Sequence, residues 1–104
     1  MIGNKVLIFV GPHTYYGTLE SLAGTTASLS GAREIPRWPG VPTNLDLASK
    51  GPNTDADCLV SGRVKEVILF GVTQVVSMSD DAVQALDAFP DCPYPVPPTP
   101  DEEV

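Results

Sequence analysis

Positive charge is scarce in this sequence, which has six lysine and arginine residues against thirteen acidic ones and a net charge of −7. The last fifteen residues, PDCPYPVPPTPDEEV, hold four of the acids and no base, so residues 1–89 carry nine acids against six bases, a net charge of −3. A body with so few cations cannot release enough counterions to hold DNA or RNA nonspecifically. A small anion in a local arginine pocket is still possible, because the nearest charges dominate over a few ångströms.

Long apolar runs are also missing. The longest, KVLIFVG, has the length of a strand, whereas a membrane helix needs roughly 20 apolar residues. The N-terminal stretch MIGNK has no charged region followed by a long hydrophobic one, so no secretory signal is expected. We therefore expect no membrane partner and a location in the cytoplasm.

Motifs for catalysis or metal binding are absent as well. Cys58 and Cys92 have no CxxC or histidine spacing, which leaves open either one disulfide or two reduced thiols. The only histidine, His13, stands in a turn, and Asp80 and Asp81 fit the first turn of a helix better than a catalytic pair. No Walker loop, nucleophile elbow or zinc motif occurs. We therefore expect that the protein is not an enzyme and that it binds no metal or cofactor.

Hydrophobic patterning predicts a mainly β fold. An almost uninterrupted apolar run at 4–10 is typical of a strand buried on both faces, and Gly17 marks a bend in the next strand. Leu19, Leu22, Ala27 and Leu29 are the inward candidates of the hairpin that follows. The expected strands are 4–10, 14–22, 25–30, a separate piece over AREI before Pro36, and 62–78 broken at Gly71.

Two helices are expected between and after these strands. The first is short and begins at the cap residue Thr43, and Lys50-Gly51-Pro52 ends it; the second begins at the cap residue Ser79 and stops before Pro90. We expect one domain over residues 1–89, a small SH3/Sm-like β-barrel with an inserted helix and a C-terminal helix, because closing the strands removes exposed edges. Residues 90–104 are expected to form a flexible, proline-rich acidic tail.

The order NKVLIFV, YYGTLESLAGTTASL, EVILFGVTQVVSM resembles the SH3-like barrel of the Sm and Hfq proteins. The RNA-reading positions of that family are not matched: Ala23-Gly24 and Thr26-Ala27 stand where it has an acidic residue and an asparagine, and Phe70-Gly71 stands where it has Arg-Gly. The resemblance implies the fold and weakens an RNA-binding role.

A second resemblance covers most of residues 2–90. The stretches IGNKVLI, YYGTL, LSGAREIPRW, NLDLASKG and EVILFGVTQVVSMSDDA are similar to a family of small uncharacterised phage and prophage proteins. This resemblance implies a phage accessory protein in the host cytoplasm.

The segment AREIPRW concentrates two of the six basic residues beside the only tryptophan. In an extended chain Arg33, Ile35 and Arg37 share one face, so the two guanidiniums can reach one phosphate while Trp38 stacks on a base. The predicted ligand-binding residues are Arg33, Arg37 and Trp38, with Tyr15, His13 and Lys50 as weaker candidates.

Three functions are left open. The favoured one is noncatalytic sequestration of a small nucleotide-type host defence signal by a homo-oligomer, an anti-defence sponge. The second is a protein-binding inhibitor or structural phage component that uses the same surface. The third is an RNA-binding Sm-like protein. Alternatively, Arg33 and Arg37 only pair with the strand acids Glu20, Glu34 or Glu66, and Trp38 covers one end of the fold.

Overall fold

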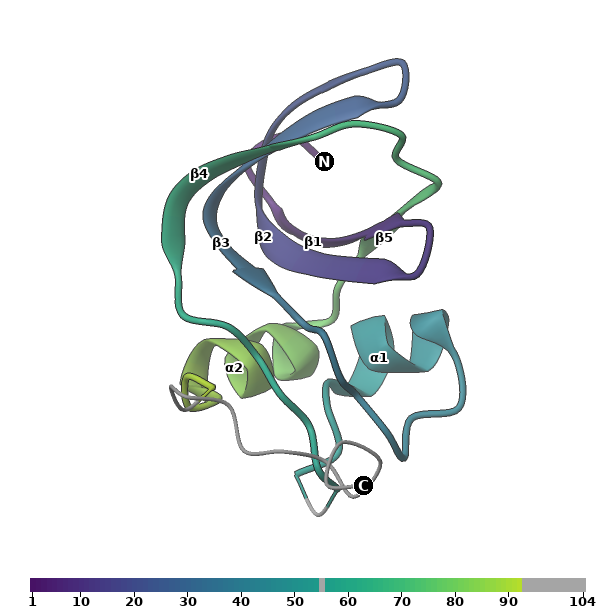
Figure 1. The fold of residues 1–104 in the computed structure, drawn as a ribbon, viewed down its shortest axis with the longest axis vertical. Helices are drawn as coiled ribbons and strands as arrows, with labels where there is room; N and C mark the ends of the chain where they lie inside the picture. The colour runs from purple at the N-terminus through teal and green to yellow at the C-terminus, as the bar shows by residue number, and fades with distance from the viewer. Residues whose placement is uncertain (55, 93–104) are drawn as a thin grey trace, which may run out of the picture.

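The computed structural model describes residues 1–54 and 56–92 (Figure 1). Its elements in chain order are β1 (Lys5–Val10), β2 (His13–Ala23), β3 (Thr26–Glu34), α1 (Asn44–Lys50), β4 (Val64–Leu69), β5 (Gln74–Ser77) and α2 (Asp80–Ala88). The expected flexible tail lies outside the described residues from residue 93 onward. The mainly β class with two short helices is confirmed.

The strands form one antiparallel sheet in the order β4-β3-β2-β1-β5. The sheet is strongly curled (Figure 1), yet β4 and β5 are its two ends, and within residues 1–54 and 56–92 they do not close it. The closed barrel expected from the sequence is therefore not confirmed. Closure would have removed both edges; instead the fold keeps β4 and β5 as edge strands.

The interior strand β1, between β2 and β5, is buried on both faces, as its apolar run predicted. Val6 and Ile8 contribute to one core cluster and Leu7 and Phe9 to the other. This split follows from the two-residue period of a strand, which sends alternate side chains to opposite faces. One cluster lies inside the curl of the sheet, and the other lies between the sheet and the helices.

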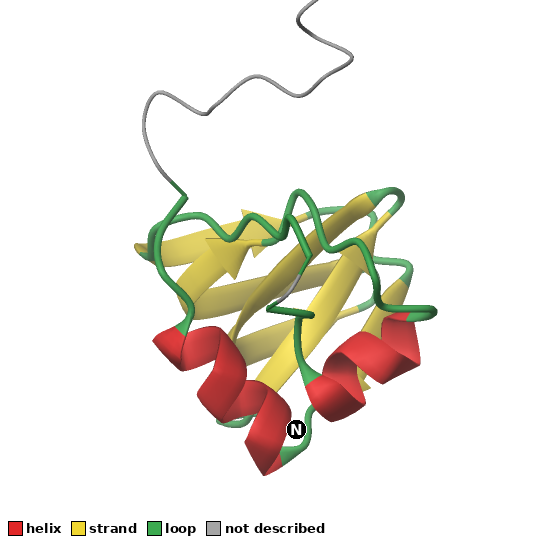
Figure 2. Ribbon diagram, turned by 90° about the horizontal axis from the view of Figure 1, so that it is seen from below, coloured by secondary structure: helices red, strands yellow, loops and turns green. Residues whose placement is uncertain are grey.

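The two helices lie side by side against one face of the sheet (Figure 2). Leu47 of α1 and Leu86 of α2 are fully buried there with Tyr16. Both caps predicted from the sequence are present: the Thr43 hydroxyl accepts a hydrogen bond from the Asp46 amide, and the Ser79 hydroxyl accepts one from the Ala82 amide.

Two local predictions about the hairpin were wrong. The stretch AREI continues β3 rather than forming a separate strand, because Gly31 takes a positive φ of 55° and the pairing to β2 continues beyond it. Leu22 is 42% exposed rather than inward. The register shift between Leu19 and Ser21 places Leu22 opposite the buried Ala27, so Leu22 is exposed because it lies one pair from the end of the hairpin and not because it faces the other way.

Candidate functional site

Arg33 of β3 points toward the helices, and its side chain is only 1% exposed. Its guanidinium donates four hydrogen bonds, to the carbonyl oxygens of Ser61 (2.7 Å), Leu86 (2.7 Å) and Phe89 (2.9 Å) and to the carboxylate of Asp91 (2.9 Å). The last carbonyls of a helix have no partner within it, and α2 has no basic residue in its own last turn. Arg33 therefore caps the end of α2 from a neighbouring strand.

This arrangement differs from both interpretations of Arg33 drawn from the sequence. Its partners are backbone carbonyls and Asp91, rather than a solvent-facing anion or the strand acids. Burial lowers the pKa of the guanidinium, the neighbouring Arg63 lowers it further, and the charge of Asp91 works in the opposite direction. With its donors bonded within the fold, Arg33 offers no exposed N–H to a ligand.

A second polar cluster surrounds Asp87 of α2. The Tyr16 hydroxyl donates to its carboxylate at 2.6 Å, Arg63 donates at 2.9 Å, and the Lys5 ammonium lies 3.8 Å away. Partial burial by itself would raise the pKa of Asp87, but the bonds from Tyr16 and Arg63 and the charge of Lys5 lower it overall. The same contact and its burial raise the pKa of Tyr16 well above its usual range. These groups fasten α2 to the sheet.

Arg37 and Trp38 follow β3 and do not join Arg33. Arg37 lies in an isolated bridge with Leu59, and its guanidinium is 3.3 Å from the Asp57 carboxylate in a largely exposed ion pair. The Trp38 indole is half-buried against the helix-side core and donates to the Thr14 hydroxyl at 3.2 Å. Trp38 therefore covers part of the core, which is the alternative to ligand binding considered for this residue from the sequence.

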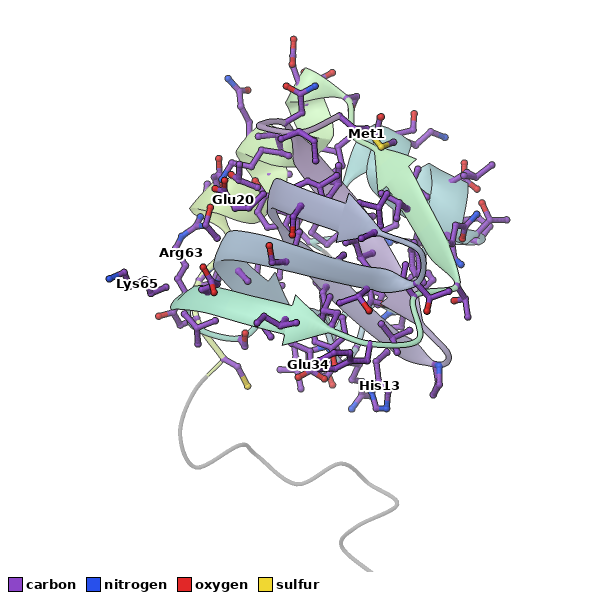
Figure 3. The ribbon with its side chains drawn as sticks, turned by 90° about the horizontal axis from the view of Figure 1, so that it is seen from above. Met1, His13, Glu20, Glu34, Arg63 and Lys65 are labelled. Atoms are coloured by element: carbon purple, nitrogen blue, oxygen red, sulfur yellow. The ribbon has the colours of Figure 1, made fainter. Side chains whose placement is uncertain are left out.

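The three weaker candidates are spread over the molecule. His13 is exposed, with Nδ1 4.0 Å from the Glu34 carboxylate, and the two residues lie together at one margin of the sheet (Figure 3). Tyr15 is half-buried against the inner core, and burial together with the charge of Glu34 raises its pKa. Lys50 ends α1 and lies beside a different depression, next to Asp46. The six predicted residues thus do not form one pocket.

One hollow lies between the start of β2, the end of β3 and the start of β4, and its volume is about 330 Å³. Its walls include Tyr15, Glu34, Ser61, Gly62, Val64 and Val67. Arg33 also borders it, but with its donors bonded elsewhere. The hollow therefore combines an aromatic ring and two valines with one carboxylate and a hydroxyl. Hereafter it is called the β4 hollow.

The strand that borders this hollow is an edge of the sheet. β4 pairs with β3 on one side only, so the backbone groups on its other side have no strand partner among the described residues. Three large apolar side chains at this edge are exposed: Val64 (51%), Ile68 (52%) and Phe70 (70%). Of these three residues, Val64 also lines the hollow.

Other chemistry is limited in the part of the chain that the structure describes. Residues 1–54 and 56–92 contain no group of three or more His, Cys, Asp or Glu side chains placed to hold a metal ion. No helix in these ranges is long and apolar enough to cross a membrane. No disulfide joins Cys58 and Cys92, and burial raises the pKa of Cys58.

Sequence reasoning missed the residues that build this region. Val64 and Val67 were assigned only to a strand, and Ser61 and Asp91 were given no role. One signal was present in the sequence: Gly62 and Arg63 separate the apolar residues at 58–60 from β4, and Gly62 lines the hollow. The partners of Arg33 had no local signal at all.

Comparison with known proteins gives a family and no relative of established activity. A family model described as Domain of unknown function (DUF6948) matches residues 11–86, which include every strand from β2 onward and all but the last two residues of α2. Neither the curated proteins nor the solved structures include a significant match to the chain. The expected phage origin is not tested by this match. On the strength of the match over most of its length, the chain belongs to the DUF6948 family.

Proposed function

We propose that this protein is a noncatalytic binding protein that takes an extended, proline-containing peptide segment into the β4 hollow. This is the protein-binding alternative from the sequence, moved from the Arg33–Trp38 segment to a different surface. Peptides in a polyproline II conformation dock into grooves lined by aromatic side chains, because their preformed shape costs little entropy. Tyr15 supplies such a ring, and Val64 and Val67 supply apolar walls.

One observation carries the proposal: Arg33, the single cation among the described residues that line the hollow, is turned inward. Arg33 is committed to Ser61, Leu86, Phe89 and Asp91, whereas Val64 is exposed and Tyr15 is half-buried. The hollow thus has apolar surface to bury and an acidic group in its wall. An uncharged or basic peptide suits it, and an anion does not.

The same observation gives less support to sequestration of a nucleotide. Two like charges 5 Å apart repel by roughly 1 kcal/mol in water and about 3 kcal/mol near a protein surface. A phosphate in the β4 hollow would meet the Glu34 carboxylate without an exposed arginine to compensate. Arg37, the other proposed phosphate ligand, does not border the hollow and is paired with Asp57.

Fluorescence anisotropy tests the proposal with two labelled probes, the octapeptide PYPVPPTP and an adenine nucleotide. Each is titrated with the wild-type full-length chain. We expect the octapeptide to bind and the nucleotide not to bind. Binding of the nucleotide alone, or of neither probe, overturns the proposal.

A matched pair of variants locates the peptide. Val64→Ser removes a wall of the hollow, whereas Ile68→Ser removes an equally exposed side chain of the same strand outside it. Burying the exposed half of a valine side chain contributes about 1 kcal/mol, so Val64→Ser should weaken octapeptide binding about fivefold. Ile68→Ser should leave it unchanged; equal weakening by both variants would indicate nonspecific adhesion to β4.

A further inference from the structure

We infer that two copies of this chain form a symmetric dimer by pairing their β4 edge strands antiparallel, with Val67 opposite the partner's Val67. The inference goes beyond the proposed function and does not rest on it. The β4 hollow lies between β4 and the strands β2 and β3, whereas the second copy approaches β4 along its other side. Three observations lead to this occupant: the free edge of β4, the apolar side chains exposed on it, and the order of its charges.

β4 is an edge strand that lacks the usual protection. Among the described strands it pairs with β3 alone, and it forms the outer margin of the sheet (Figure 1). Natural proteins shield such edges with prolines, bulges or charged side chains. The β4 sequence, VKEVIL, has no proline, and its register against β3 runs without a shift. Its only charged residues are Lys65 and Glu66, which lie next to each other at the start of the edge strand (Lys65 is labelled in Figure 3).

Apolar surface distinguishes β4 from the other edge of the sheet. Val64, Ile68 and Phe70 are all more than half exposed along β4 and just after it. β5, at the opposite edge, has four residues, and none of them is an exposed large apolar residue. A second β4 therefore offers apolar surface for burial that the β5 strand of a second copy does not.

Two-fold symmetry restricts how two β4 strands can align. Residues opposite each other in an antiparallel pair point to the same face, and neighbours along a strand point to opposite faces. In a symmetric pair, one residue must therefore lie opposite its own copy. A centre at Lys65 or Glu66 puts like charges opposite each other, which is destabilising. A centre at Ile68 places Val64 opposite residue 72, beyond the end of β4.

A centre at Val67 avoids both problems. The facing pairs are then Val64 with the partner's Phe70, Lys65 with the partner's Leu69, and Glu66 with the partner's Ile68. No like charges meet over residues 64–70, and the pair of Val64 with the partner's Phe70 joins a β-branched and an aromatic side chain, a favourable combination across strands.

The length of the edge sets the strength of the dimer. Six strand residues span about 20 Å. Pairing along this length gives an interface near the lower limit of specific protein–protein interfaces, about 1,200 Å². We therefore expect a reversible dimer with a dissociation constant in the micromolar range.

Sedimentation velocity of the full-length chain over a series of concentrations measures this dissociation constant. The variants Ile68→Glu and Ile68→Lys are matched, because each puts one charge at the same exposed position, opposite the partner's Glu66. We expect Ile68→Glu to weaken dimerisation about tenfold or more, because it creates two symmetric like-charge contacts, and Ile68→Lys to stay within about threefold of the wild type. Leu45→Glu adds the same charge at an exposed position of α1 and should leave the dissociation constant unchanged.

Cysteine crosslinking locates the centre of the pair. In a background with Cys58→Ser and Cys92→Ser, two residues that face each other across antiparallel strands have Cα atoms about 4.5–5.5 Å apart, which a disulfide can bridge. We expect Val67→Cys to form a disulfide-linked dimer under mild oxidation. Glu66→Cys is the control, because its two copies lie diagonally, about 7–8 Å apart, and should crosslink poorly.

The outcomes that overturn the inference are distinct. They are a wild type that stays monomeric at every concentration, species larger than a dimer, equal weakening by Ile68→Glu and Ile68→Lys, and a dimer that neither variant weakens. Faster crosslinking of Glu66→Cys than of Val67→Cys overturns it as well. Peptide binding is measured separately by anisotropy, so failure of the dimer and failure of the proposed function are told apart.

Discussion

Replacement of Arg33 by methionine tests whether this residue is part of the fold or part of a ligand site. Methionine fills a similar space but donates no hydrogen bond, so the carbonyls of Ser61, Leu86 and Phe89 lose their common donor. An unsatisfied buried acceptor costs about 1–3 kcal/mol. The ion pair with Asp91 adds little, because the Asp91 side chain is 72% exposed.

These contributions give a loss of about 3 kcal/mol in the free energy of unfolding, since only the Leu86 carbonyl is fully enclosed and water can reach the others. A domain of this size has a total stability of roughly 5–14 kcal/mol. The melting temperature should fall by about 12–24 °C. Arg33→Lys should recover only part of the loss, because one ammonium cannot reproduce the planar fork that reaches four acceptors.

Urea unfolding followed by circular dichroism and by the fluorescence of Trp38 measures the effect. The matched control is Arg37→Met, which removes the exposed ion pair with Asp57 and should cost less than 1 kcal/mol. A loss below 1 kcal/mol for Arg33→Met, or an equal loss for both variants, would refute the reasoning. If Arg33 were a ligand-binding residue, its replacement would preserve stability and abolish binding.

Three further predictions concern the attachment of α2 and the end of α1. Burial and the contact with Asp87 raise the folded-state pKa of Tyr16 above its ordinary value of 10.0. The stability that Tyr16 contributes is therefore complete below pH 10 and is lost as the pH rises further. Tyr16→Phe should flatten that decline in stability, measured by urea unfolding between pH 9 and 11. The pKa of Asp87 is lowered in the folded state, so its contribution to stability is present above the ordinary carboxylate pKa and is lost as the pH falls through the lowered value. Asp87→Asn should lack this loss of stability when its unfolding is followed in an acid titration. Gly51→Ala should cost about 2–3 kcal/mol in thermal unfolding, because Gly51 has φ +80° and a Cβ there would lie 2.9 Å from the Cβ of Ala85. The control Gly71→Ala has a similar φ of +75° but open space around it, and it should cost only about 1–2 kcal/mol; equal losses would contradict the close approach of the two helices.

Much of the fold could be predicted because its signals are local. The double-sided burial of β1 follows from its apolar run, and the helix starts at Thr43 and Ser79 follow from capping chemistry. Failures occurred where the outcome depended on position in the folded sheet. Leu22 lies opposite the buried Ala27 but close to the end of the hairpin, where it is exposed, and the positive φ at Gly31 let β3 continue instead of ending it.

The candidate site was less predictable than the fold. Clustering of Arg33, Arg37 and Trp38 in the sequence suggested one binding surface, yet each turned out to contact a different part of the molecule. Tyr15, a weaker candidate from the sequence, is half-buried and lines the hollow, and its role in binding stays a prediction. The valines of the hollow carried no functional signal, because an exposed valine and a buried one look alike in a strand sequence.

The sequence by itself determined the mainly β class, the strand and helix starts, and the low positive charge that disfavours nonspecific nucleic-acid binding. These properties depend on neighbouring residues or on composition, so no spatial information is needed. Only the tertiary structure decided what the scarce cations do and whether the sheet closes. The four partners of Arg33 lie 28, 53, 56 and 58 residues away in the chain. No periodicity or spacing encodes contacts over such separations, because they arise only when the curled sheet brings α2 and the segment before β4 together around one guanidinium.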